Sequence, residues 1–250
     1  MAELENNINE TQVENTPKEE IVENGSGQQE EAAENPENLQ EGESQDGEGE
    51  GGDEEPVEPV KDYKVLIALS KKRGSKRILV PSMEGYESGY NIDGIYVEKG
   101  GEARIFALAD IVKPFGINST DLSPNDKNYG KISQSIGGMD GEESTQTLID
   151  IYYLGAGTAC VDAKEYGWLP AGGELDLALA CIEDFNAMCE VLECDPIDSG
   201  KYWLSQRRNA NYAWFYDVEH GGYGSWLGGM DELKVRPVKS AEGYEEVGAE

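Results

Sequence analysis

The sequence predicts an α+β domain in which helices pack against an antiparallel sheet, preceded by a disordered acidic N-terminal tail. Three observations lead to this fold class. Short β-prone runs occur in pairs between residues 65 and 108, apolar residues recur at helical spacing between residues 144 and 192, and further strands separated by long loops follow Pro196.

The tail is predicted from charge and composition. Residues 1–60 carry 20 of the 51 acidic residues but only Lys18 of the 20 basic residues, and they contain no aromatic side chain. Such a segment buries too little apolar area to offset an ordering cost of roughly 1–2 kcal/mol per residue. We therefore expect a disordered tail, with a low-complexity linker from Gly42 to Pro59. It lacks the basic start and apolar run of a secretion signal.

Two β-hairpins are predicted after the tail. Their strands are residues 65–69 with 78–80, and residues 94–97 with 104–108. A polar turn containing Gly74 joins the first pair, while Gly100 and Gly101 supply the positive φ of a tight turn in the second. Residues 81–91 are expected to connect the hairpins, and a polar loop is expected from about residue 114 to 141.

Helices and further strands are predicted next. Ser144 or Thr145 is expected to cap a helix that runs to Tyr152, and a short helical segment is expected over residues 159–166. One apolar stripe predicts a long helix and comprises Leu175, Ala178, Leu179, Ile182, Phe185, Cys189 and Leu192. The later predicted strands are residues 202–204, 213–218 and 233–238.

Several short motifs occur in an order that resembles a known family. They are Gly94-Ile95-Tyr96-Val97, Ala107-Leu108, Thr147-Leu148-Ile149, Trp168-Leu169-Pro170, Glu174-Leu175, Tyr202-Trp203, Ala213-Trp214 and Val235-Arg236-Pro237-Val238. The order resembles the C-terminal domain of Legionella collagen-like proteins, common in Bacteroidetes and their phages. The resemblance implies a C-type-lectin-like fold, shared with formylglycine-generating enzymes and phage tropism-determining tail proteins. It covers residues 91–240, leaving residues 61–90 as a β-hairpin and connecting segment and residues 241–250 as a flexible C-terminus.

Several motif residues are expected to be structural. The family usually has a serine where this chain has Ala171, which with Glu174 would form a reciprocal capping box, so Glu174 is interpreted as a helix-start residue. Trp168, Trp203 and Trp214 are expected in the core. The expected role of Arg236 is an ion pair or a clamp on main-chain carbonyls.

Catalytic and metal chemistry have few candidates. His220 is the only histidine, which excludes imidazole-dependent triads and most metal sites. Cys160, Cys181 and Cys189 are expected in the core, while a Cys189–Cys194 or a Cys160–Cys181 bridge stays open. The formylglycine-generating relatives use two cysteines near the C-terminus, and no cysteine follows Cys194. The chain is therefore expected not to be an enzyme.

Charge and motif content limit the ligands and partners. No cofactor is expected, although Asp121 to Asn128 and Asp195 to Asp198 offer oxygens for a structural calcium ion. Residues 61–250 hold 31 acidic and 19 basic residues, which disfavours nucleic-acid binding, and no apolar run is long enough for membrane insertion. The local exception to the acidic charge comprises Lys71, Lys72, Arg73, Lys76 and Arg77, interpreted either as a solvated hairpin turn or as a docking site for an acidic partner or the chain's own tail.

The candidate recognition surface is the loop-rich stretch from Gln206 to Trp226, which is rich in Tyr, Asn, Arg and Trp. Its residues are Gln206, Arg207, Arg208, Asn209, Asn211, Tyr212, Tyr216, His220, Tyr223 and Trp226. The alternative is that Tyr212, Tyr216 and Trp226 only cover the sheet, and that His220 is a plain surface residue.

The resemblance, together with the lack of catalytic groups and of a secretion signal, implies a binding module on a phage virion, synthesised in the host cytoplasm, that recognises a cell-surface glycan or protein receptor. Its partners could equally be other virion proteins or copies of itself. The first alternative is a capsid or tail decoration protein without a host ligand, and the second is an enzyme related to formylglycine generation.

Overall fold

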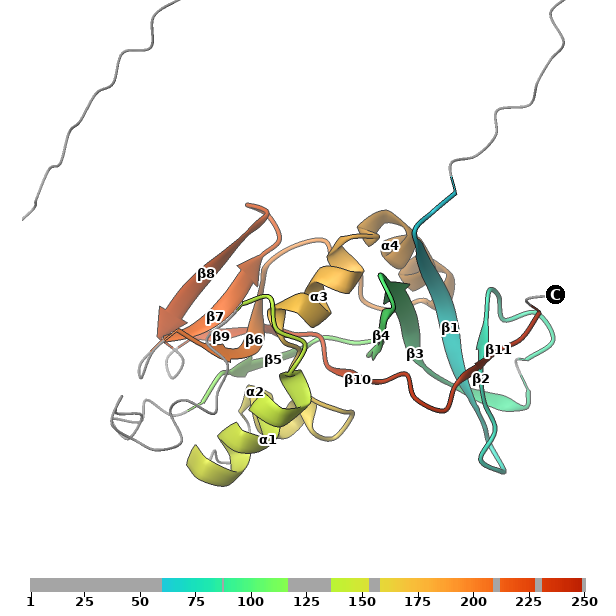
Figure 1. The fold of residues 1–250 in the computed structure, drawn as a ribbon, viewed down its shortest axis with the longest axis horizontal. Helices are drawn as coiled ribbons and strands as arrows, with labels where there is room; N and C mark the ends of the chain where they lie inside the picture. Colours follow the sequence, from blue (N-terminus) through green and yellow to red (C-terminus); the bar gives the residue numbers. More distant parts are fainter. Residues whose placement is uncertain are drawn as a thin grey trace, which may run out of the picture. The chain divides into compact units, whose positions relative to one another are not determined.

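The computed structural model describes residues 60–86, 88–116, 136–152, 158–208, 212–227 and 231–248. They form a mixed α+β fold with two β-sheets and four helices (Figure 1). The predicted acidic tail lies outside the described residues apart from Val60. None of the described helices has both the length and the apolar run that a membrane crossing requires.

The first sheet, sheet A, contains both predicted hairpins. Its strand order is β10-β4-β3-β1-β2-β11, formed by β1 (Tyr63–Lys71), β2 (Arg77–Val80), β3 (Tyr90–Lys99), β4 (Glu102–Phe106), β10 (Val238–Ser240) and β11 (Glu245–Glu246). Gly100 and Gly101 connect β3 to β4 with φ values of 61° and 86°, as their turn requires. β11 lies within the stretch expected to be a flexible C-terminus and pairs in parallel with β2.

The second sheet, sheet B, has the order β5-β9-β6-β7-β8. Its strands are β5 (Ile111–Pro114), β6 (Lys201–Arg207), β7 (Tyr212–Asp217), β8 (Gly222–Leu227) and β9 (Glu232–Val235). Sequence patterns do not predict β5 or β8. The strand predicted at residues 233–238 is wrong as a single element, because the chain leaves sheet B after β9 and enters sheet A at β10.

The four helices are α1 (Gly141–Tyr152), α2 (Ala159–Ala163), α3 (Gly172–Leu179) and α4 (Ile182–Leu192). The predicted cap at Ser144 or Thr145 is wrong, because α1 begins one turn earlier and the Ser144 N–H bonds to the Asp140 carbonyl at 2.9 Å. The Thr145 hydroxyl instead bonds to the main chain of Leu169, accepting its N–H at 3.1 Å. These hydroxyls therefore face the interior and do not mark the helix end.

The long helix predicted through residue 192 is divided in two. Cys181 leaves helical geometry, with φ −130° and ψ 35°, between α3 and α4. Tertiary packing explains the division, because α3 contacts β3, β4 and β6 while α4 contacts β1 (Figure 1). Because α3 and α4 pack on different strands, the chain turns between them, while the apolar residues of both helices still face the core.

The main core lies where α3 and α4 meet both sheets. It includes Ile95, Phe106, Leu175, Phe185 and Tyr202, all fully buried. A second cluster centres on Trp203, with Phe115 and Phe215 at its ring edges. Trp168 and Trp203 are buried as predicted, whereas Trp214 is only half-buried.

The expected role of Glu174 as a helix-start residue is confirmed. One oxygen of its fully buried carboxylate accepts the Ala171 N–H at 2.9 Å and the Trp168 indole N–H at 3.0 Å, and the other accepts Arg104 at 2.7 Å. The Ala171 methyl group cannot accept a bond in return. Only one half of the capping box therefore forms.

Candidate binding face

The described residues of the loop-rich stretch from Gln206 to Trp226 form the end of β6 and the β7–β8 hairpin. Cross-strand pairs such as Trp214 with Ser225 and Tyr216 with Tyr223 fix the register of β7 and β8. Because alternate strand residues point to opposite sides of a sheet, the hairpin divides the candidate residues between two faces. The strand predicted at residues 213–218 corresponds to β7, whereas β8 lies where a loop was expected, because glycine and polar residues obscure its strand signal.

One side of the hairpin, which we call the tyrosine face, gathers most of the described candidates that are exposed or half-buried. It consists of Arg208, Tyr212, Trp214, Tyr216, Tyr223 and Ser225. The Arg208 guanidinium donates to the Ser225 hydroxyl at 2.9 Å and lies 5.7 Å from the Trp214 ring centre. The exposed Arg208 side chain is thus held across the strands and against an aromatic ring.

The other end of the tyrosine face is anchored to α3. The Tyr223 hydroxyl donates to the Asp176 carboxylate, and its ring packs edge-on against Tyr216 at 5.1 Å between ring centres. Burial, followed by the bond to Asp176, raises the pKa of Tyr223, so its hydroxyl stays a donor. Tyr216 and Tyr223 therefore fix the hairpin, while Arg208 and Tyr212 form its open end, with Tyr212 38% exposed.

Gln206 and Arg207 are buried beneath the face. Gln206 accepts the Gly172 N–H at 3.1 Å, linking β6 to the start of α3, and Arg207 lies 5.5 Å from the Phe115 ring centre. In this arrangement they support the surface and do not form it. The Gln206 Nε2 and Trp214 Nε1 atoms are buried without a hydrogen-bond partner among the described residues.

Trp226 lies on the opposite side of the hairpin. Its ring centre is 6.0 Å from that of Phe215 and 5.6 Å from the Lys201 ammonium, and the side chain is 43% exposed. Gly224 makes this packing feasible, since a Cβ there would come within 2.4 Å of the Phe215 ring. Trp226 and Tyr212 therefore cannot contact one flat ligand surface together.

The turn between β7 and β8 holds His220, which is exposed as expected. Its Nδ1 lies 3.0 Å from the Asp217 carboxylate, and Lys201 lies 3.3 Å from the same group. The bond from His220, and to a smaller extent that from Lys201, lowers the pKa of Asp217. Donor atoms of Asp217, Glu219 and His220 lie within 4.8 Å of one another, a spacing that sequence reasoning missed. Glu219 and His220 are exposed and Asp217 is already paired, so the cluster gives no separate sign of a metal site.

Other candidates lie elsewhere or outside the described residues. Asn209, Asn211 and the stretch from Asp121 to Asn128 fall outside them. At the second calcium candidate, the Asp195 carboxylate accepts the Asp110 N–H and the Asp195 carbonyl accepts Arg236, at 3.0 and 2.7 Å. These two oxygens of Asp195 are therefore already occupied by hydrogen bonds within the fold.

All four cysteines are free thiols. Cys160, Cys181 and Cys189 are buried as expected, and Cys194 is half-buried with its sulfur hydrogen-bonded to that of Cys189. Burial raises the pKa of Cys160 and Cys189 to about 12 and that of Cys181 to about 11. Because the thiolate is the nucleophile, these environments suppress cysteine chemistry at neutral pH.

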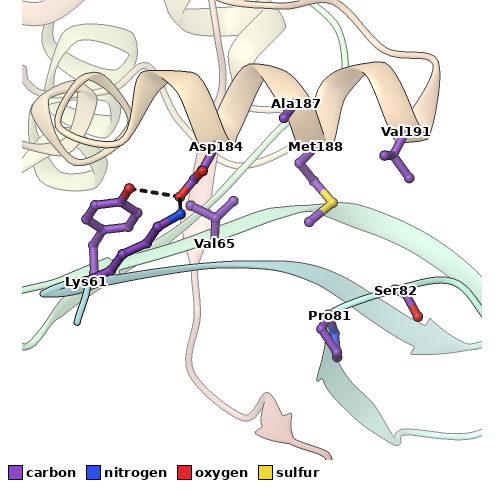
Figure 2. A pocket seen from close by; sticks show the side chains of 9 residues that line it. Lys61, Val65, Pro81, Ser82, Asp184, Ala187, Met188 and Val191 are labelled. Atoms are coloured by element: carbon purple, nitrogen blue, oxygen red, sulfur yellow. Dashed lines mark hydrogen bonds and ion pairs between the residues drawn. The ribbon is translucent and has the colours of Figure 1, made fainter. Parts of the chain in front are cut away.

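A groove that the sequence did not indicate lies between α4 and the β1–β2 hairpin, with a volume of about 450 Å³ (Figure 2). At one end Asp184 accepts Lys61 at 2.5 Å and Tyr63 at 2.8 Å. Its apolar lining includes Val65, Met188 and the exposed Val191. Lys61 and Tyr63 also line the groove, so one end of it lies beside the first residues of β1.

Comparisons with known proteins give one structural similarity. The sequence matches no family model and no curated protein. Among solved structures, the chain is similar to a fimbrial protein from Bacteroides ovatus, with 16% identity and a TM-score of 0.41 over 53% of this chain. The matched part spans about one third, 34%, of that protein. A similarity of this extent carries no conclusion about function.

Proposed function

We propose that this chain is a non-enzymatic binding module with a C-type-lectin-like domain, displayed on a phage virion. In this proposal the open end of the tyrosine face binds a cell-surface glycan or protein receptor. The observation that carries the proposal is the placement of Arg208 and Tyr212 at the exposed edge of a hairpin whose other end is anchored to α3.

The residue types suit recognition. Tyrosine offers a large amphipathic ring at low entropic cost, and arginine offers several donors in a planar group. The Arg208–Ser225 bond and the packing on Trp214 restrict the arginine before any ligand arrives. Such preorganisation lowers the entropic cost of binding.

The lectin-like part of the proposal is supported by the order of the motifs in residues 91–240 and by the structural positions of their residues. Trp168, Glu174 and Trp203 connect helix starts and strands inside the domain. These structural roles agree with the resemblance, which implies that the motif residues form the frame of the domain and that any recognition residues lie in the segments between the motifs.

The non-enzymatic part is supported by the environments of the reactive side chains. His220 is exposed and paired with Asp217, and three of the four thiols are buried with raised pKa values. The proposal requires neither a metal nor a cofactor. Formylglycine-type chemistry would instead need two accessible cysteines poised in a cleft.

Two experiments test the proposal. Mass spectrometry of purified phage particles should detect the chain, and its absence from them would reject virion display. Fluorescently labelled full-length protein should bind host cells, and prior removal of surface glycans or digestion of surface proteins should identify the receptor class. Equal binding to host and non-host cells would contradict a specific receptor.

A decoration protein is the second candidate function, favoured by the edge of sheet B. Among the described strands β8 pairs only with β7, and its sequence Gly222–Leu227 contains no charge and no proline. Native edge strands usually carry such residues to prevent further pairing. In this alternative β8 pairs with a neighbouring subunit, and cryo-EM of particles would show the tyrosine face buried.

A further inference from the structure

The turn between β1 and β2 concentrates positive charge in an acidic protein. Its five cations, which we call the basic hairpin, are Lys71, Lys72, Arg73, Lys76 and Arg77, and all of them are exposed. None has a carboxylate within ion-pair distance among the described residues.

Other cations of the described part differ in this respect. Nine of them have carboxylate partners: Lys61, Lys64, Lys99, Arg104, Lys113, Lys201, Lys234, Arg236 and Lys239. Because residues 61–250 hold 31 acidic and 19 basic residues, potential partners are plentiful. Five adjacent cations without a partner in such a chain therefore mark a surface that suits an anionic ligand.

A hollow beside the turn gives this charge a defined shape. Its volume is about 420 Å³, and its lining consists of Ser70, Lys71, Gly74, Ser75, Arg77 and Gly243. Lys71 ends β1 and Arg77 begins β2, so the two cations of the hollow come from opposite sides of the turn. The Arg77 guanidinium lies 5.5 Å from the Tyr244 ring centre, and this packing restricts the side chain before any ligand binds.

The main chain of the turn offers further donors. The N–H groups of Arg73, Gly74 and Ser75 make no hydrogen bond among the described residues, whereas the Lys71 N–H below them bonds to the Lys76 carbonyl at 2.9 Å. Successive main-chain N–H groups in turns form anion-binding sites, and ammonium and guanidinium groups form charge-assisted bonds to oxyanions. The turn thus combines both kinds of donor.

One carboxylate lies close to the hollow, but it is already bonded within the fold. Asp93 accepts the Ser70 hydroxyl at 2.9 Å and the Tyr244 hydroxyl at 2.7 Å, and the Lys239 ammonium lies 4.0 Å from it. These partners of Asp93 do not include any cation of the basic hairpin. The cations of the hollow therefore stay available to a ligand.

We propose that the basic hairpin binds an anionic polysaccharide, and that one of its sulfate or phosphate ester groups enters the hollow between Lys71 and Arg77. Donors of several kinds surround the hollow, which suits the three terminal oxygens of such an ester better than the two oxygens of a carboxylate. Five cations exceed the charge of one ester group. The complementary ligand is therefore a polymer with repeated charges.

Other polymers and surfaces with phosphate groups fit the turn less well. Single-stranded nucleic acids bind through aromatic side chains on which the bases stack, and anionic membranes bind through apolar side chains that insert beside the cations. Residues 72–76, Lys-Arg-Gly-Ser-Lys, contain neither kind of side chain. None of the exposed large apolar side chains of the described part lies in the turn; they are Val60, Val112, Val191, Tyr212, Trp226 and Val247. A hydrated polysaccharide requires no such contact.

The basic hairpin and the tyrosine face belong to different sheets. β1 and β2 are strands of sheet A, whereas β7 and β8 are strands of sheet B (Figure 1). Polysaccharide binding at the basic hairpin therefore does not depend on receptor binding at the tyrosine face.

The affinity of the full-length chain for fluorescent dextran sulfate tests the site, with uncharged dextran as the blank. The hollow variant carries Lys71→Gln and Arg77→Gln. A matched control, Lys164→Gln with Arg208→Gln, removes one lysine and one arginine at exposed positions elsewhere. At about 0.15 M salt the hollow variant should bind about tenfold or more weakly, and the control within about twofold of the wild type. Equal losses would show unspecific attraction and overturn the proposal.

A second variant within the turn tests the role of the hollow itself. Lys72→Gln with Arg73→Gln removes the same two types of charge from residues that do not line the hollow. Its affinity for dextran sulfate should fall by only about threefold, because these cations contribute attraction without contacting the bound ester. A loss as large as that of the hollow variant would reject the hollow as the binding site.

Competition distinguishes the ligand classes. At equal ionic strength, sodium sulfate or sodium phosphate should displace dextran sulfate at lower concentration than sodium acetate, and the more effective of the two identifies the ester. The hollow variant should lose this difference. Equal competition by acetate, or tighter binding of polyglutamate than of dextran sulfate, would assign a carboxylate ligand and overturn the proposal. Tighter binding of single-stranded DNA, or of vesicles that contain anionic lipid, would overturn it as well.

Discussion

Arg236 and Asp110 form an ion pair that joins two crossings of the chain between the sheets. The Nε–Oδ1 distance is 2.7 Å, and the residues are 126 positions apart. Asp110 lies on the way from β4 to β5, and Arg236 lies between β9 and β10. Arg236 also donates to the Ala107 carbonyl at 3.3 Å, which confirms both roles expected of it, ion pair and carbonyl clamp.

Arg236→Ala should be among the most destabilising single changes. It leaves the buried Asp110 carboxylate without its main partner, which costs about 3–5 kcal/mol in comparable cases. The free energy of unfolding from urea titration measures the effect. Lys113→Ala, which removes the partly exposed pair with Asp162 at 3.2 Å, should cost less than about 1 kcal/mol. Equal effects of the two changes would refute the assigned role.

Ala171→Ser should stabilise the protein by about 1 kcal/mol. The new hydroxyl would accept the Glu174 N–H and complete the capping box, of which the Glu174-to-Ala171 half already exists. Thermal unfolding gives the sign. Ala180→Ser at the other end of α3 serves as a control, because no cap forms there, and a gain for both changes would point to another cause.

The thiols should be slow to react in the native protein at pH 8. Burial raises the pKa of all four thiols, and Cys194 should react first with a thiol reagent because it is half-buried whereas Cys160, Cys181 and Cys189 are buried. All four should react rapidly in denaturant. Two or more fast native thiols would revive the enzymatic alternative.

The Asp184 link should weaken in acid. Bonds from Lys61 and Tyr63 lower the pKa of Asp184 below its unfolded value of about 3.9. Its contribution to stability is therefore present above that pH and is lost as the pH falls through the lower folded value. Asp184→Asn should thus destabilise at pH 7 and have little effect near pH 2, as measured by urea titration. A pH-independent difference would contradict the linkage.

Local sequence patterns were sufficient to predict those elements whose residues lie close together in the chain. The hairpins around Gly74 and Gly100, the helix ending at Tyr152 and the buried Trp168 and Trp203 follow from spacing and composition. The division at Cys181 and the change of sheet at Arg236 depend on contacts with distant strands. No local signal marks them.

The sequence was sufficient to select the candidate residues, but it did not predict how they are arranged in space. Tyr212, Tyr223 and Trp226 stand out by residue type, yet the stretch contains glycine and polar residues that obscure β8. Only the β7–β8 register separates the tyrosine face from Trp226, and only burial removes Gln206 and Arg207 from the surface.

The most direct test of the proposed binding face compares its two sides in a host-cell binding assay. Arg208→Ala and Tyr212→Ala should each weaken binding by about tenfold or more. Trp226→Ala on the other side, and Val112→Ala at an exposed position of β5, should leave affinity within about twofold, with folding of every variant verified by circular dichroism. Unchanged affinity in the Arg208 and Tyr212 variants, or an equal loss with Trp226→Ala, would contradict the assignment of the tyrosine face.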